Sequence, residues 1–101
     1  MFGKLGDMMG KLQEMKQRAE ETKRKLAERI ILIEGAGGDI KVEMTGDRKV
    51  TKLEISPAFQ HGKKSALEDG LLTTLNRALA EVEKINEEEL KKAASGLLPG
   101  L

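Results

Sequence analysis

The stretch GAGGDIKVEMTGDRKVTKLEISP, residues 35–57, decides the fold of this chain. Residues 40–45 alternate between apolar and polar side chains, which is typical of a strand with one buried face. Gly46-Asp47-Arg48 predicts a turn. A second alternating run, residues 50–55, ends near Pro57, because proline cannot donate a hydrogen bond to a neighbouring strand. The glycines that open the stretch allow positive φ angles and predict another turn.

Apolar residues mark the buried face of both strands. On the first strand they are Ile40, Val42 and Met44, and on the second Leu53 and Ile55, which share their face with Thr51. The preceding run Ile30, Ile31, Leu32 and Ile33 also predicts a strand, because its β-branched residues and the glycines after it favour a strand over a continued helix. Four consecutive aliphatic residues are typical of a strand buried on both faces. A single covering helix leaves one face of that strand bare, so we expect the first helix and a second subunit to cover it. These four residues are the predicted dimer interface.

A long helix is predicted from Asp7 to Arg29, with Asp7 as its N-cap. Apolar residues recur along it at alternating spacings of three and four and form a narrow heptad seam: Leu5, Met8, Leu12, Met15, Ala19, Thr22 and Leu26. Because Ala19 and Thr22 are small, the seam predicts a stripe offered to a partner rather than an autonomous coiled coil.

A second helix is predicted to begin at the capping box of Ser65 and Glu68, after a loop over residues 59–64. Its apolar face, which we expect to cover the sheet, comprises Leu67, Leu71, Leu75, Ala78, Leu79, Val82 and Ile85. Beyond this face the helix becomes highly charged and is expected to project into solvent or reach a partner. Gly96 predicts its C-terminal end, followed by a frayed tail over about residues 96–101.

Length and composition predict a single α+β domain over residues 1–101, with the element order α-β-β-β-α. Aromatic residues make up 2% of the chain, so its core must be aliphatic and thin, and a second subunit would complete the burial. The chain has no cysteine, no continuous apolar signal region, and no apolar run approaching the ~20 residues that span a bilayer. We therefore expect a cytoplasmic protein that contacts no membrane.

The residues needed for familiar catalytic or metal sites are missing from the sequence. His61 is the only histidine, so a nucleophilic dyad or a zinc site would depend on this one loop residue. Gly62-Lys63 resembles the end of a phosphate-binding loop, but Pro57 replaces its first glycine and Lys64 replaces the Ser or Thr that binds Mg²⁺. We predict no enzymatic activity, no metal, no cofactor and no small-molecule substrate.

The distribution of charge gives partial support for nucleic-acid binding. Residues 1–30 carry eight Lys or Arg and five Asp or Glu, a net charge of +3, whereas the whole chain has a net charge of +1. The basic side chains of the first helix either reach phosphates or keep the helix soluble in pairs with glutamates. Without Trp or Tyr there is no stacking platform for single strands, so duplex DNA held by salt-sensitive backbone contacts is the nucleic acid expected.

The chain resembles the YbaB/EbfC family of nucleoid-associated proteins over most of its length. Residues 1–28, MFGKLGDMMGKLQEMKQRAEETKRKLAE, are similar to the family's Met-, Gln- and Lys-rich first helix. Residues 35–57 are similar to its glycine-started hairpin, with Leu53-Glu54-Ile55-Ser56-Pro57 the closest match. Residues 67–85 resemble the following helix, and residues 95–100 the Gly/Pro tail.

This resemblance implies a two-layer subunit with a three-stranded antiparallel sheet, in a tight homodimer shaped like tweezers with helical arms. It also implies a nucleoid-associated protein that binds duplex DNA with little sequence preference. The DNA-binding residues that it implies by position are Lys11, Lys16, Arg18, Lys23, Arg24, Lys25 and Arg29 on the first helix, and Lys91 and Lys92 on the second.

A dimeric protein–protein adaptor without direct DNA binding is the alternative. The heptad seam, the apolar first strand and the near-zero net charge all fit that function. Recovery of a specific protein partner that survives nuclease treatment would favour the adaptor over the DNA-binding protein.

Overall fold

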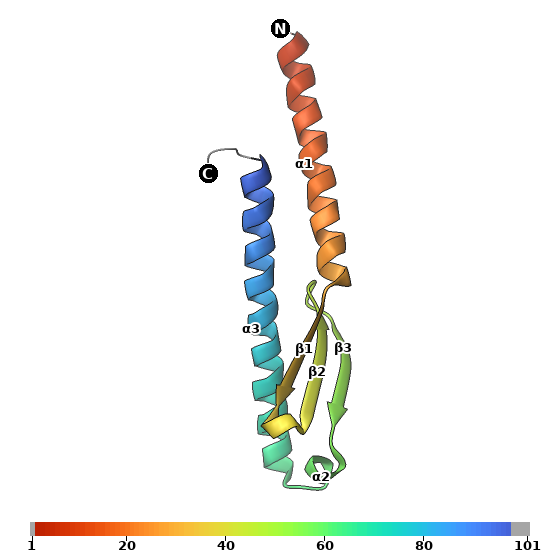
Figure 1. The fold of residues 1–101 in the computed structure, drawn as a ribbon, viewed down its shortest axis with the longest axis vertical. Coiled ribbons are helices and arrows are strands. Elements are labelled where there is room, and N and C mark those ends of the chain that lie inside the picture. The colour runs from red at the N-terminus through yellow and green to blue at the C-terminus, as the bar shows by residue number, and fades with distance from the viewer. Residues whose placement is uncertain (1, 98–101) are drawn as a thin grey trace.

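The computed structural model describes residues 2–97 and confirms the α+β fold with the order α-β-β-β-α. Its elements are α1 (Phe2–Glu28), β1 (Ile30–Gly35), the 3₁₀ turn η1 (Ala36–Gly38), β2 (Ile40–Thr45), β3 (Val50–Ile55), α2 (Pro57–Gln60) and α3 (Lys64–Leu97). The strands form one antiparallel sheet in the order β1-β2-β3. The molecule is elongated, with extents of 71 × 23 × 16 Å, because α1 and α3 both run beyond the end of the sheet (Figure 1).

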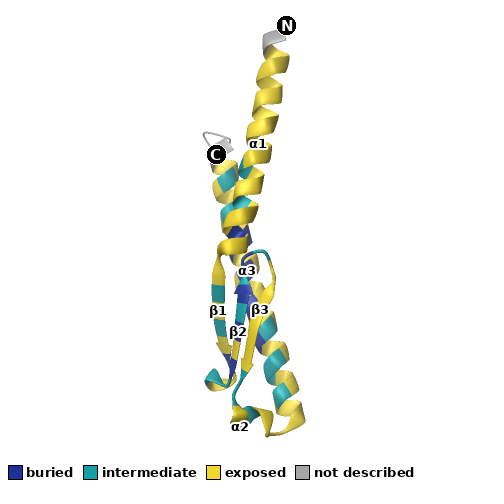
Figure 2. Ribbon diagram, turned by 90° about the vertical axis from the view of Figure 1, so that its right-hand side faces the viewer, coloured by how far each residue is buried: buried dark blue, intermediate teal, exposed yellow. Residues whose placement is uncertain are grey.

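The core lies between the central strand and α3 (Figure 2). Ile40, Val42 and Met44 are buried, as the alternation in β2 predicts, and they pack against Ala78 and Val82 of α3. Burying a side chain of this size stabilises the fold by about 1.5–3 kcal/mol. The predicted apolar face of α3 is confirmed except at Leu79, which lies at the margin of this face and is 41% exposed.

The first strand is buried on one face only. Ile31 and Ile33 pack against the core, whereas Ile30 is 61% exposed and Leu32 is 70% exposed. The prediction that the first helix helps to cover this strand is wrong, because α1 continues along the axis of the sheet instead of lying over it (Figure 1). The second face of β1 is therefore bare in the single chain.

The third strand differs from its predicted pattern by one residue. Leu53 and Ile55 lie opposite Val42 and Ile40, as the alternation predicts, but Val50 rather than Thr51 lies opposite Met44. A bulge causes this shift, since the register changes between Glu43 and Met44. The Thr51 hydroxyl instead donates a hydrogen bond to Glu43 Oε2 at 2.7 Å.

Three predicted helix boundaries are wrong. Helix α1 begins at Phe2, so Asp7 lies inside it and is not its N-cap. The predicted loop over residues 59–64 begins inside the short helix α2, which is capped by the Ser56 hydroxyl as it accepts a hydrogen bond from Phe59 N at 3.2 Å. Helix α3 begins at Lys64, which places Ser65 inside its first turn.

The C-terminal end of α3 also differs from its prediction. The helix includes Gly96 and extends to Leu97, so Gly96 does not end it. Of the predicted frayed tail, residues 98–101 lie outside the described part of the chain.

The sheet approaches α3 closely at Gly35. A Cβ atom added there would lie 1.9 Å from Thr74 Oγ1, so only glycine fits without a shift of the helix. Thr74 itself is buried and donates its hydroxyl hydrogen bond to Gly70 O at 2.7 Å. This contact fixes the separation between α3 and the edge strand β1.

Candidate nucleic-acid interface

The β2–β3 turn joins both long helices to the sheet. Gly46 N donates a hydrogen bond to Arg29 O at 2.9 Å, and Gly46 O accepts one from Asn86 Nδ2 at 2.6 Å. A Cβ atom on Gly46 would lie 2.6 Å from Leu26 O, so the turn needs glycine to approach α1 this closely. These contacts set the direction in which the helices leave the sheet.

An ion pair adds a second link between this turn and α3. Arg48 Nε donates to Glu83 Oε1 at 2.5 Å. This hydrogen bond, together with the positive charge of the guanidinium, holds the pKa of the Glu83 carboxyl below its ordinary value. The pair lies at the surface and ties the turn to α3 without contributing to the core.

Beyond the sheet, α1 and the distal part of α3 pack side by side and antiparallel; we call residues 2–28 and 86–97 the arm (Figure 1). Leu26 is buried there and Thr22 is half-buried. Arg29, which links α1 to β1, places its Nη1 3.9 Å from Glu89 Oε1 of α3. The prediction that α3 projects into solvent or reaches a partner beyond Ile85 is therefore corrected for the first turn of that segment, because Asn86 is buried and Glu89 lines a groove with Arg18 and Lys25 of α1.

The basic residues of α1 project in three directions. An α-helix turns about 100° per residue, so residues seven apart lie on nearly the same face and about 10.5 Å apart along the axis. Lys11, Arg18 and Lys25, which we call the basic stripe, therefore follow one edge of the seam. Lys16 and Lys23 follow its other edge, and Arg24 lies on the back of the helix.

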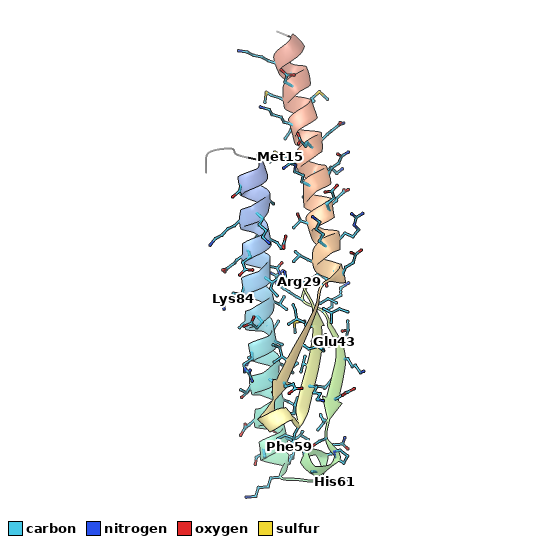
Figure 3. The ribbon with its side chains drawn as sticks, in the orientation of Figure 1. Met15, Arg29, Glu43, Phe59, His61 and Lys84 are labelled. Atoms are coloured by element: carbon cyan, nitrogen blue, oxygen red, sulfur yellow. The ribbon has the colours of Figure 1, made fainter. Side chains whose placement is uncertain are left out.

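The basic stripe meets α3 at a groove. Arg18, Lys25 and Lys92 line it together with Glu21 and Glu89, and its volume is about 400 Å³. The structure thus brings three of the nine predicted DNA-binding residues to one surface of the arm. Arg29 lies at the base of the arm (Figure 3), and helical geometry points Lys91 away from α1.

Acidic side chains reduce the positive charge of this surface. Glu14 accepts a hydrogen bond from Arg18 at 2.9 Å, and Glu89 lies 3.8 Å from Lys92 Nζ. Exposed pairs of this kind are worth about 0–1 kcal/mol, so a phosphate can displace the carboxylate from its partner. Lys11 and Lys25 project from exposed positions of the same edge.

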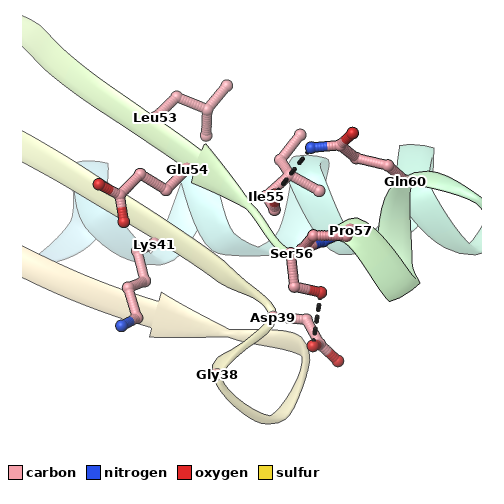
Figure 4. A pocket seen from close by; sticks show the side chains of 9 residues that line it. All are labelled: Gly38, Asp39, Lys41, Leu53, Glu54, Ile55, Ser56, Pro57 and Gln60. Carbon is pink, nitrogen blue, oxygen red and sulfur yellow. Dashed lines mark hydrogen bonds between the residues drawn. The ribbon is translucent and has the colours of Figure 1, made fainter.

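Another hollow lies at the other end of the sheet, and its polar groups are already engaged within the chain (Figure 4). It has a volume of about 520 Å³ and is lined by residues of β2, β3 and α2 and by the turn before β2. Its polar groups already hold the chain in place: Ser56 Oγ donates to Asp39 Oδ1 at 2.7 Å, and Gln60 Nε2 donates to Ile55 O at 2.9 Å.

The described residues also bear on whether the chain has a catalytic histidine, a metal site or a membrane-spanning helix. His61 is exposed at the C-terminal end of α2 (Figure 3). Among residues 2–97, His, Asp and Glu side chains form no group of three that could hold a metal ion. Within the same range, neither long helix has a stretch apolar enough to cross a bilayer.

Comparison with known proteins points to one family. The model of the YbaB/EbfC DNA-binding family matches residues 1–97. A nucleoid-associated protein of Acinetobacter baumannii is 37% identical over 82 residues, which cover 79% of this chain and 75% of that protein. A nucleoid-associated protein of Hahella chejuensis is 33% identical and covers 94% of this chain and 88% of its own length. The crystal structure of an uncharacterised Helicobacter pylori protein shares the fold, with a TM-score of 0.78 at 23% identity over 91% of this chain and 95% of that one.

Proposed function

Because this chain belongs to the YbaB/EbfC DNA-binding family, we propose that it is a nucleoid-associated protein that binds duplex DNA as a homodimer, mainly through phosphates and with little sequence preference. The observation that carries the proposal is the basic stripe on an arm that projects from the sheet. Lysine and arginine side chains on an exposed helix reach phosphates readily, and such contacts carry no sequence information directly.

The spacing of the stripe supports contact with a duplex. Lys11 and Lys25 lie two heptads apart, so the stripe runs for about 21 Å along α1. That length matches about six base pairs at 3.4 Å per base pair, enough for several phosphates of one strand. Lys92 extends the same surface onto α3, beside Arg18 and Lys25.

Two bare apolar surfaces support self-association. The first is the outer face of β1, where Ile30 and Leu32 of the predicted interface remain exposed while Ile31 and Ile33 serve the core of their own chain. A dimer that covers the outer face would complete the burial that the sequence predicts for this strand.

The second bare surface lies on the core-facing side of β3. Val50 and Leu53 face the same side of the sheet as the core but are about half exposed, at 50% and 47%. Leu79 lies on the adjacent flank of α3, opposite the flank on which Arg77 contacts β1. A second copy seated on this surface would cover three apolar side chains at once.

Fluorescence anisotropy with a labelled random-sequence duplex tests the DNA-binding part of the proposal. We expect binding at low salt that weakens steeply toward physiological salt, because phosphate contacts release condensed counterions. Equal affinity for unrelated duplexes would fit weak sequence preference. A failure to bind at low salt would refute the proposal and favour the adaptor.

Sedimentation equilibrium tests the dimer and distinguishes its two candidate surfaces. Leu32→Glu places a charge on the outer face of β1, and Leu53→Glu places one beside the core-facing side of β3. The variant that dissociates the dimer identifies the interface, while the other serves as its matched control. A wild-type protein that sediments as a monomer at all concentrations would refute the homodimer.

A further inference from the structure

The apolar seam of α1 continues beyond the end of α3 and is bare there. Met8 is 64% exposed and Leu12 is 62% exposed, and Leu5 and Met15 are also exposed. At the level of Met15, the seam enters an apolar groove of about 310 Å³ that Leu90 and Ala93 of α3 help to line. Only the C-terminal part of the seam, near Leu26, is covered by α3.

The edges of the seam carry one sign of charge. In the heptad pattern, one flanking position holds Lys4, Lys11, Arg18 and Lys25, and the other holds Met9, Lys16 and Lys23. No acidic residue occupies either flank. Two copies of α1 packed seam to seam would therefore place basic residues opposite each other in both parallel and antiparallel orientations, and like charges at these positions oppose pairing.

The chain itself shows which partner suits this surface. Helix α3 packs on the C-terminal part of the seam and presents Glu89, which lines a groove with Arg18 and Lys25 and lies 3.9 Å from Nη1 of Arg29, the residue that follows α1. A helix that continues along the bare seam would meet the same apolar stripe and further basic residues. Apolar contacts at the seam and acidic residues at its edges are the chemistry that such a helix must supply.

We propose that the bare seam of α1, from Leu5 to Met15, docks an amphipathic helix of another protein whose apolar stripe is flanked by Asp or Glu. The bound helix would lie across the basic stripe and so compete with duplex DNA for the arm. The inference that the seam docks a helix depends only on the seam itself. The inference that this helix competes with DNA rests on the proposed DNA-binding function.

A synthetic peptide provides the probe. It has four heptads with Leu at both seam positions, Glu at both flanking positions, and a fluorescent label. Glutamates at the flanks repel one another and keep the free peptide largely unfolded, so helix formation measured by circular dichroism reports docking. We expect the full chain to bind this peptide and to bind its counterpart with Lys at the flanks far more weakly.

The double variant Met8→Gln and Leu12→Gln tests the seam directly. Both residues are exposed and glutamine is a good helix former, so the fold and the net charge are preserved. Loss of about 1.5 kcal/mol of burial per side chain corresponds to about a tenfold weaker complex each, or about a hundredfold together. We expect duplex binding by this variant to remain at the wild-type level, and the acidic peptide to displace duplex from the wild-type protein.

Several results would overturn the proposal. If the charge reversals Lys11→Glu and Arg18→Glu abolish peptide binding and the seam variant leaves it unchanged, charge attraction alone holds the peptide and the seam is not its docking site. Dissociation of the wild-type oligomer by the seam variant would show that a second copy occupies the seam. Binding of the seam to anionic lipid vesicles but not to the peptide would assign it to a membrane surface. Peptide docking without any duplex binding would refute the proposed function and the competition but leave the docking surface intact.

Discussion

Removal of the basic stripe should change how steeply DNA affinity depends on salt. In the triple variant Lys11→Ala, Arg18→Ala and Lys25→Ala, each protomer loses the basic stripe, three of the four basic residues on one edge of α1. Alanine is the best helix former, so the helix should persist in this variant. All three side chains lie outside the hydrophobic core, so the sheet and its packing should also be unaffected.

The size of the effect follows from counterion release. Each phosphate contact contributes about −0.9 to the slope of log K against log salt, so three contacts contribute about −2.7 per protomer. Between about 50 and 200 mM salt, the wild-type protein should therefore lose about fortyfold more affinity per protomer than the variant loses. Anisotropy titrations of one labelled duplex at four or five salt concentrations would measure both slopes.

The matched control removes the same charge elsewhere. Lys52→Ala, Lys63→Ala and Lys64→Ala lower the net charge equally, but these residues lie on β3 and at the start of α3, away from the arm. The control should keep the wild-type slope. Equal slopes in the wild type and the stripe variant would refute the assignment of the basic stripe to DNA binding. Equal reductions of the slope in the stripe variant and the control would show that only the net charge matters.

Three further predictions concern how the arm is held. Gly35→Ala should lower the free energy of unfolding by about 1–3 kcal/mol, measured by urea titration, because the added methyl overlaps Thr74. Asn86→Ala should cost about 1–3 kcal/mol in the same assay, because it leaves a buried carbonyl of the β2–β3 turn without its donor. Glu83→Gln should lower the melting temperature at neutral pH but not in acid. The Arg48 partner lowers the pKa of Glu83, so its stabilisation is present above the ordinary carboxyl pKa and is lost as pH falls through the lowered one.

Matched substitutions separate these effects from general damage. Gly62→Ala introduces a methyl at ordinary contact distances of 3.5 and 3.6 Å, and should change stability by less than about 0.5 kcal/mol. Asn76→Ala removes an exposed amide from the same helix and should be equally mild. A melting-temperature difference between Glu83→Gln and wild type that persists unchanged in acid would contradict the role given to that carboxylate.

The strands were predictable because their burial is decided locally. β2 is the central strand and has one face against α3, so a simple alternation of Ile40, Val42 and Met44 is enough to identify its buried face. The bulge opposite Glu43 leaves no comparable mark in the sequence. Alternation alone sets Val50 on the face opposite Leu53 and Ile55, and its place opposite Met44 emerges only from the pairing with β2.

Two buried polar residues were missed although a signal was present. Thr74 precedes Ala78 by four residues, and Asn86 follows Val82 by four, so both occupy the apolar spacing of α3. A polar residue at a core position must satisfy its hydrogen bonds, and each does so with a backbone carbonyl. Their position in the apolar pattern predicts burial, whereas the identity of the distant carbonyl at Gly46 requires the structure.

The candidate site was predictable as a set of residues but not as a surface. Lys23, Arg24 and Lys25 are consecutive and suggest one cluster, yet consecutive helical residues point about 100° apart and cannot share a phosphate. Only the position of α3, which packs beside Arg18 and Lys25, shows which edge of α1 gathers further positive charge. Charge reversal of Lys23, Arg24 and Lys25 together would therefore change three surfaces at once, whereas substitution of the basic stripe changes only one.

The arrangement of charge around α1 reconciles a nearly neutral chain with a DNA-binding arm. Acidic residues recur every seven positions, at Asp7, Glu14, Glu21 and Glu28, and each of the first three precedes a member of the basic stripe by four residues. This acidic row lies beside the stripe on the side away from the seam, where Glu14 pairs with Arg18, so basic residues border the seam and acidic residues do not. A duplex that approached from the acidic side would meet repulsion, while one that approached over the seam would meet basic residues on both edges. The same side is the one that an acidic helix would occupy, and this shared approach is why DNA and such a helix should exclude each other.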